Sequence, residues 1–224
     1  MKKIITSILL IALFVPLCAC GNKSINIKDY LIEERDNLFL AKDSIYQSTL
    51  SSGKREIDYD LDGIVNEKTD FAILSISRLD NEPMANDNYS YSVTIGDETY
   101  TGSLEKSSID NSYVADLEVA IPDDSEVSII ITFTGYTFDQ TATNVSTDFA
   151  YDKSSILEIA NKELSNELKN IVKNNKIEVI MKIIKDYSSE LNNYYYYIGV
   201  VATNGEVLGL LISTDTGEVV SKKV

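Results

Sequence analysis

Residues 89–104 read YSYSVTIGDETYTGSL and set the expectation for the fold of the chain. Polar and apolar side chains alternate over residues 89–95, as they do in a strand with one buried and one solvated face. Gly96 and Asp97 are turn residues, and residues 98–104 follow them as a second strand. The stretch therefore predicts an antiparallel β-hairpin.

The segment around this hairpin, residues 44–147, has the same β character. Further strands are predicted by alternating or continuously apolar runs at 71–79, 113–121 and 127–133. Residues of the turn-forming types separate these runs at regular intervals. Short, evenly spaced strands are typical of antiparallel sandwiches, so we predict a β-sandwich over this segment.

One run in this segment resembles a known type of domain. Residues 114–133, VADLEVAIPDDSEVSIIITF, are similar to the paired late strands of fibronectin type III and bacterial immunoglobulin-like domains. The resemblance implies a sandwich fold. It implies no particular activity, because domains of this architecture carry many unrelated functions.

The C-terminal part, residues 152–224, begins with a change of period. Apolar residues recur at steps of three or four over residues 152–173, which predicts an amphipathic helix. Ser155 and Glu158 have the spacing of a capping box at its start. An Asn-Gly pair, the strongest short hairpin signal, follows further along. Three strands are predicted after the helix, at 177–184, 194–202 and 206–212.

The end of the chain resembles the PepSY domain. Residues 204–220, NGEVLGLLISTDTGEVV, contain Asp215, Gly217 and Val219, which match the turn that ends a strand in that family. The resemblance implies a PepSY-like αβββ module over residues 152–224 and, as a function, inhibition or regulation of an extracytoplasmic protease. The chain as a whole is thus predicted to be α+β, an antiparallel β-sandwich followed by a helix plus a three-stranded antiparallel meander.

The tyrosine run from Tyr194 to Tyr197 lies in one of these strands. Side chains alternate between the two faces of a strand, so Tyr194 and Tyr196 are predicted to pack against the helix as ordinary core. Tyr195 and Tyr197 then form cross-strand pairs on the other face.

The first 19 residues have the layout of a secretory signal. Lys2 and Lys3 precede an apolar run over residues 4–16, and a small residue, Ala19, stands directly before Cys20. The apolar run is too short for a spanning helix.

Residues 17–20, Leu-Cys-Ala-Cys, resemble the lipobox of bacterial lipoproteins. The resemblance implies a signal peptide over residues 1–19, cleavage before Cys20, and a diacylglyceryl thioether on the Cys20 sulfur. It also implies a location on the outer face of the cell membrane. Residues 20–43 would then hold the lipidated cysteine, a polar tether and a lead-in that is a short amphipathic helix or an irregular first strand. The alternative is an ordinary cleaved signal with incidental thiols.

Composition excludes several classes of function. The formal net charge of −15 repels phosphate backbones and anionic lipid headgroups, so nucleic acid is not an expected partner, whereas cations and basic proteins are compatible. The chain of 224 residues contains no histidine, which excludes Ser-His and Cys-His nucleophiles and imidazole metal ligands. We therefore expect a non-enzymatic binding or adaptor module on the membrane, with a protein partner as one candidate ligand.

Residues 58–70, DYDLDGIVNEKTD, are the one stretch with the pattern of a metal site. Aspartates at alternate positions before Gly63 resemble an EF-hand-like calcium loop, although Thr69 stands where that loop has its bidentate acid. The alternative is a strand whose aspartates face solvent. If the loop binds calcium, weakly and as the sole cofactor, the predicted ligands are Asp58, Asp60, Asp62, the Ile64 carbonyl and Glu67.

Overall fold

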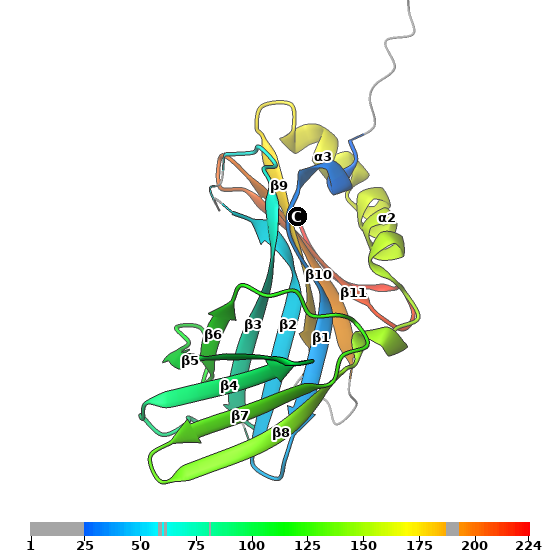
Figure 1. Cartoon of the computed structure of the whole chain (residues 1–224). Coiled ribbons are helices and arrows are strands. Elements are labelled where there is room, and N and C mark those ends of the chain that lie inside the picture. Colours follow the sequence, from blue (N-terminus) through cyan, green and yellow to red (C-terminus); the bar gives the residue numbers. More distant parts are fainter. Residues whose placement is uncertain (1–24, 58–59, 61, 81, 187–192) are drawn as a thin grey trace, which may run out of the picture.

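The structure is a computed structural model, and it describes residues 25–57, 60, 62–80, 82–186 and 193–224 (Figure 1). Within these residues, twelve strands form one sheet in the order β12-β11-β10-β9-β1-β2-β3-β6-β5-β4-β7-β8. The strands are β1 Leu31–Lys42, β2 Tyr46–Glu56, β3 Lys68–Arg78, β4 Tyr89–Ile95, β5 Glu98–Lys106, β6 Tyr113–Leu117, β7 Val127–Phe133, β8 Tyr136–Asn144, β9 Ile177–Lys185, β10 Tyr194–Ala202, β11 Val207–Ser213 and β12 Val219–Lys223. The helical segments are η2 Ile27–Tyr30, η3 Ser146–Asp148, α2 Lys153–Glu163 and α3 Ser165–Ile171.

Eight of these strands, β1-β2-β3-β6-β5-β4-β7-β8, close into an antiparallel barrel. The ring closes where Phe39 and Leu40 of β1 pair with the end of β8, and the backbone N–H of Val145 donates to the Leu38 carbonyl at 2.9 Å. β5 turns the corner of the ring, because it pairs along its length with β4 but meets β6 only at Glu105 and Lys106. The barrel occupies the lower part of Figure 1.

The inside of the barrel is an apolar core. Each strand sends alternate side chains inward, and chains from opposite walls meet there. Tyr46 and Phe138 stack near one end, with ring centroids 4.8 Å apart. Fully buried members include Phe39, Leu50, Leu74, Ile76, Val93, Ile129 and Ile131.

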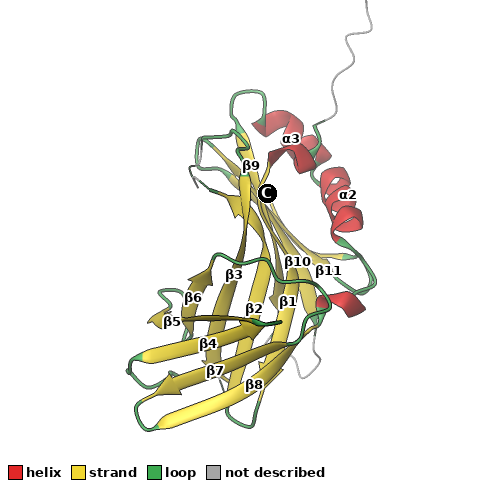
Figure 2. Cartoon of the chain, in the orientation of Figure 1, coloured by secondary structure: helices red, strands yellow, loops and turns green. Residues whose placement is uncertain are grey.

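A second layer extends the sheet beyond the barrel. β9 pairs in parallel with the first half of β1, and β10, β11 and β12 continue from it as an antiparallel meander. Figure 2 shows α2 and α3 beside these C-terminal strands and away from the barrel. The helices and strands share a second core, which includes Ile156, Leu164, Leu168, Val179, Met181, Ile198 and Leu210.

β1 belongs to both cores. Phe39 is buried in the barrel, whereas Leu31 and Leu38 are buried in the second core. The pairing of β1 is irregular at two places, between Leu31 and Glu33 toward β9 and between Arg35 and Asn37 toward β2. Bulges of this kind bend a strand and increase its twist, so β1 can leave the barrel wall and continue into the second layer.

The predicted β-sandwich is wrong, and with it the α+β fold class and the resemblance to fibronectin type III and immunoglobulin-like domains. Residues 31–42, which the prediction placed in a lead-in ahead of the β segment, form a long strand that pairs on both sides and closes a barrel. The hairpin over residues 89–104 is present as β4 and β5. Inward and outward positions alternate in the same way in barrels and sandwiches, so the local pattern cannot tell them apart.

The resemblance to the PepSY domain is also wrong. The strands that follow the helices in this chain do not form a separate three-stranded unit. β9 pairs with β1 of the barrel, and β12 adds a fourth strand beside β11. The helical segment is divided at Leu164 into α2 and α3. The predicted capping box is wrong too, since Asp152 is the N-cap and its carboxylate accepts from the Ser155 N–H at 2.8 Å.

The predictions for the N-terminus concern residues outside the described part of the chain. The signal peptide, the lipobox and Cys20 all lie within residues 1–24, so they stay predictions. None of the helices among residues 25–57, 60, 62–80, 82–186 and 193–224 combines the length and the apolar character that crossing a bilayer requires. The division of the chain into parts at residues 44–147 and 152–224 also stays a prediction.

Candidate functional site

The predicted calcium loop connects β2 to β3 and does not continue β2, which ends at Glu56. Asp58 lies outside the described residues. Asp60, Asp62, Ile64 and Glu67 are all exposed. The Ile57 N–H donates to the Glu67 carbonyl at 3.2 Å and closes the loop, and the Asp62 carboxylate accepts from the Ile64 N–H at 2.8 Å. The alternative of a strand through this region is wrong for the described residues.

Calcium binding by this loop stays a prediction. Among the residues that the structure describes, no three acidic, cysteine or histidine side chains are grouped so that they could hold a metal ion. Asp60 and Asp62 are exposed, and the Asp62 carboxylate already accepts from the Ile64 N–H.

Two buried glutamates lie beneath the same loop, and the sequence analysis did not identify them. Glu178 of β9 accepts from the Gly63 N–H at 2.5 Å, and Glu56 of β2 accepts from the Asn66 N–H. Lys176 donates to the Asp62 carbonyl at 3.1 Å. The loop is therefore fastened to the start of β9. The sequence does contain an indication of Glu178, because it is the one acidic residue in the mostly apolar strand β9.

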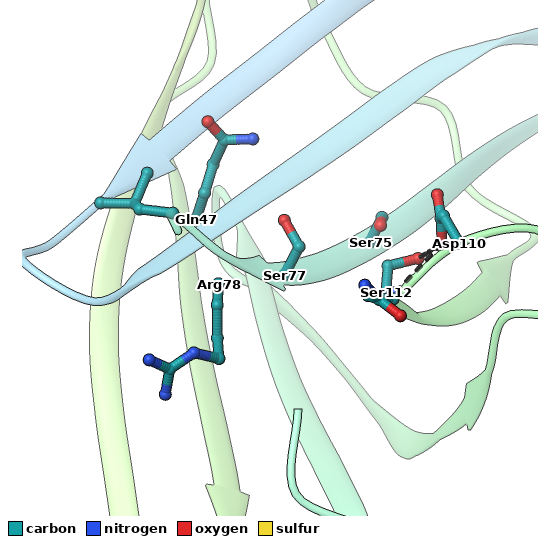
Figure 3. Close-up of a pocket in the computed structure, with 8 residues that line it drawn as sticks. Gln47, Ser75, Ser77, Arg78, Asp110 and Ser112 are labelled. Carbon is teal, nitrogen blue, oxygen red and sulfur yellow. Dashed lines mark hydrogen bonds between the residues drawn. The ribbon is translucent and has the colours of Figure 1, made fainter. Parts of the chain in front are cut away.

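A separate pocket of about 250 Å³ lies on the outside of the barrel wall. It is bordered by β2, β3 and the loop between β5 and β6 (Figure 3). Figure 3 shows the polar ends of Gln47, Ser75 and Ser77 on one side of β3, whereas Arg78 points to the other side. The lining residues are Gln47, Ser75, Ser77, Arg78, Leu79, Asp110, Asn111 and Ser112.

The two charged groups of the pocket are each satisfied by a neighbour. The Arg78 guanidinium donates from Nε to Asp80 at 2.9 Å, and this interaction lowers the pKa of Asp80 to about 2. The Asp110 carboxylate accepts from the Ser112 N–H at 3.0 Å. Burial by itself would raise the pKa of Asp110, but hydrogen bonds such as this one leave it below the ordinary value. The positive charge of Arg78 is therefore balanced by Asp80, whereas Asp110 keeps its negative charge and is stabilised by hydrogen bonds from neutral groups.

One residue that lines the pocket, Gln47, is hydrogen-bonded to the second layer. Gln47 is buried, and its side-chain oxygen accepts from the Lys185 ammonium of β9 at 3.0 Å. Burial lowers the pKa of Lys185, and the nearby charge of Lys42 lowers it further. The sequence analysis missed this pocket, because serines at alternate positions of β3 have the pattern of any solvated strand face.

The two faces of the tyrosine run agree with the prediction for Tyr196 and Tyr197. Tyr196 is buried, and Tyr194 and Tyr196 both contact Phe149, with ring centroids 5.4 and 6.2 Å apart. Tyr197 lies on the opposite face of β10, where the Lys182 ammonium is 5.5 Å from its ring centroid. The run is therefore mainly structural.

Comparison with known proteins adds no relative. No family model, curated protein or solved structure matches this chain.

Proposed function

We propose that the chain is a non-catalytic binding or adaptor lipoprotein on the outer face of a bacterial cytoplasmic membrane, and that the pocket beside β3 binds a small neutral molecule of the size of a monosaccharide. The pocket carries this proposal, because hydroxyl and amide groups from three segments of the barrel wall converge on about 250 Å³. Ligand sites commonly combine such a hollow with a few convergent polar groups.

The chemistry of the lining supports a neutral, hydroxyl-bearing ligand. Ser75 and Ser77 are half-buried and present hydroxyls, which both donate and accept hydrogen bonds. Arg78 already pairs with Asp80, and Asp110 keeps its negative charge, so an anionic ligand would gain little from Arg78 and would be repelled by Asp110. The volume lies just below the range of about 300–1,000 Å³ that is typical of ligand pockets, which favours a single ring over an oligomer.

The test is an NMR titration of the full chain with free glucose, galactose and N-acetylglucosamine. We expect concentration-dependent shifts of the backbone amides of Ser75, Ser77 and Ser112 with at least one of the sugars. Ser77→Leu should abolish them, because the larger apolar side chain fills the pocket and removes a hydroxyl.

A matched control is Ser103→Leu, on the exposed side of β5 and outside the pocket. It makes the same chemical change and should leave the titration unaltered. Absence of shifts with all three sugars, or equal shifts in Ser77→Leu, would contradict the sugar-binding part of the proposal.

The membrane part of the proposal rests on the order of the N-terminal features. Lys2 and Lys3, the apolar run over residues 4–16 and Ala19 before Cys20 follow one another as in lipoprotein signals. Two or more acyl chains on one residue give stable anchoring, at about 0.8 kcal/mol per buried CH₂. The binding role is preferred to catalysis because the chain has no histidine. Protease regulation rested on the PepSY resemblance and is not proposed.

Replacing Cys20 should release the protein from the membrane. We expect Cys20→Ala protein to leave the detergent phase in a Triton X-114 partition, because it has no sulfur at the lipidated position. Cys18→Ala is the matched control and should stay in the detergent phase, since Cys18 departs with the signal peptide. If Cys20→Ala protein partitions like the wild type, the lipid anchor is not on this residue.

A further inference from the structure

Two carboxylates buried at the junction of the barrel and the second layer have an unsatisfied oxygen. Glu56 is the last residue of β2, Glu178 is near the start of β9, and each side chain belongs to a residue only 1% exposed. In both, one carboxylate oxygen, Oε2, is shielded from solvent and has no hydrogen-bond partner. Buried polar atoms almost always have a partner, so two such oxygens require an explanation.

The two carboxylates lie under the same short stretch of the loop. The Oε1 atom of Glu178 accepts a hydrogen bond from the Gly63 N–H, and the Oε1 atom of Glu56 accepts one from the Asn66 N–H. Gly63 and Asn66 belong to the same loop. Three residues of chain span at most about 10 Å, so both side chains lie under a short piece of backbone. Glu56 and Asp62 are close enough to Glu178 for their negative charges to act on its carboxylate, which the backbone N–H groups of Gly63 and Asp62 stabilise.

This arrangement calls for positive charge. An ionised carboxylate loses most of its hydration when it is buried, and a second one nearby adds repulsion. The ammonium of Lys176 donates to the Asp62 carbonyl at 3.1 Å, where it is exposed. One proton would neutralise one of the two carboxylates, whereas one divalent cation would neutralise both.

We propose that Glu56 and Glu178 bind a divalent metal ion of the calcium class beneath the loop that joins β2 to β3, with their two Oε2 atoms as ligands. Carboxylate oxygens are the ligands that such hard cations prefer. The same loop carries the exposed carboxylates of Asp60, Asp62 and Glu67, whose charges raise the local cation concentration.

This site differs from the calcium loop that the sequence predicts. Its ligands come from the buried ends of two strands, and Glu178 lies 115 residues from Gly63 in the chain. The ion would hold the barrel and the second layer together. With two acidic ligands and the rest of its shell from backbone carbonyls and water, affinity is expected in the weak extracellular range, about 10⁻⁴–10⁻³ M.

The test is thermal unfolding of the full chain in about 10 mM calcium chloride and, separately, in excess chelator. At roughly ten times the dissociation constant, binding should raise Tm by about 3–6 °C. Glu178→Gln should fold, because the amide oxygen still accepts the Gly63 N–H and a buried charge is gone. Its Tm in chelator should equal or exceed that of the wild type and should not respond to calcium, and Glu56→Gln should also lose the response.

The matched control is Asp60→Asn, the same carboxylate-to-amide change on an exposed residue of the loop. It should keep the calcium response, and equilibrium dialysis should find one calcium ion per wild-type chain. An equal wild-type Tm in both buffers would overturn the proposal, as would a calcium response retained by both glutamine variants. Loss of the calcium response in Asp60→Asn would indicate that the ligands are the exposed carboxylates of the loop, and this result would also overturn the proposal.

Discussion

Gly53→Ala is expected to destabilise the chain by about 3 kcal/mol or more, the upper end of the cost of overpacking. A Cβ atom at Gly53 would lie 1.9 Å from the carbonyl oxygen of Glu34 and 2.9 Å from the Cα of Arg35. These are backbone atoms of the paired strand β1, so no side-chain rotation can relieve the clash. The β1–β2 ladder must open instead. Urea unfolding followed by circular dichroism measures the loss as a lower midpoint.

Gly96→Ala is the matched control. Gly96 sits in the turn between β4 and β5 with φ of +58°, and nothing lies within 4 Å of its added Cβ. Its cost is therefore the conformational one alone, about 1–2 kcal/mol. Equal midpoints for the two variants would mean that β1 does not approach β2 as closely as the structure has it.

The position of Gly53 explains why the size of its side chain matters. It pairs with Arg35, next to the irregularity between Arg35 and Asn37 where β1 bends away from the barrel. Lys153 of α2 binds Glu34 and Asp36 in this region, at 3.2 and 2.8 Å. The bend therefore joins three elements, and a glycine on β2 makes room for it.

Local signals in the sequence were enough to predict most strands but not their closure into a barrel. Residues 89–104 and 194–212 form the predicted hairpins, since each depends on alternation and a turn within one short stretch. Residues 31–42 were harder, because the middle of this strand is charged. Glu33 is paired with Arg35 at 2.6 Å, and Glu34 with Lys153, which satisfies those charges inside the fold. Such partners are not visible in a local pattern.

The candidate sites show the same limit. The acidic loop has the pattern of a calcium site because its aspartates are close together in sequence, yet the described ones are exposed. Glu56 and Glu178 come under the same loop only because β1 lies between β2 and β9 in the sheet. The pocket beside β3 likewise combines Gln47 with Ser112, which are far apart in the chain. Sites assembled by long-range pairing need the topology before they can be recognised.

The fragment of residues 44–147 is expected to be unfolded on its own, although it contains seven of the eight barrel strands. Without β1, both β2 and β8 become open edges, and the place of Phe39 in the barrel core is empty. Loss of a single buried phenylalanine side chain costs about 3–5 kcal/mol. That alone is comparable to the net stability of about 5–15 kcal/mol that a typical domain has.

The matched fragment is residues 31–147, which restores β1 and lets the ring close. We expect a cooperative thermal transition and dispersed amide resonances from this longer fragment and neither from residues 44–147. Its stability should remain below that of the full chain, because Leu31 and Leu38 lose the partners that bury them in the second core. A cooperative transition in residues 44–147 would contradict this prediction. It would show that the seven strands are stable without β1 and that closure of the barrel is not required for their stability.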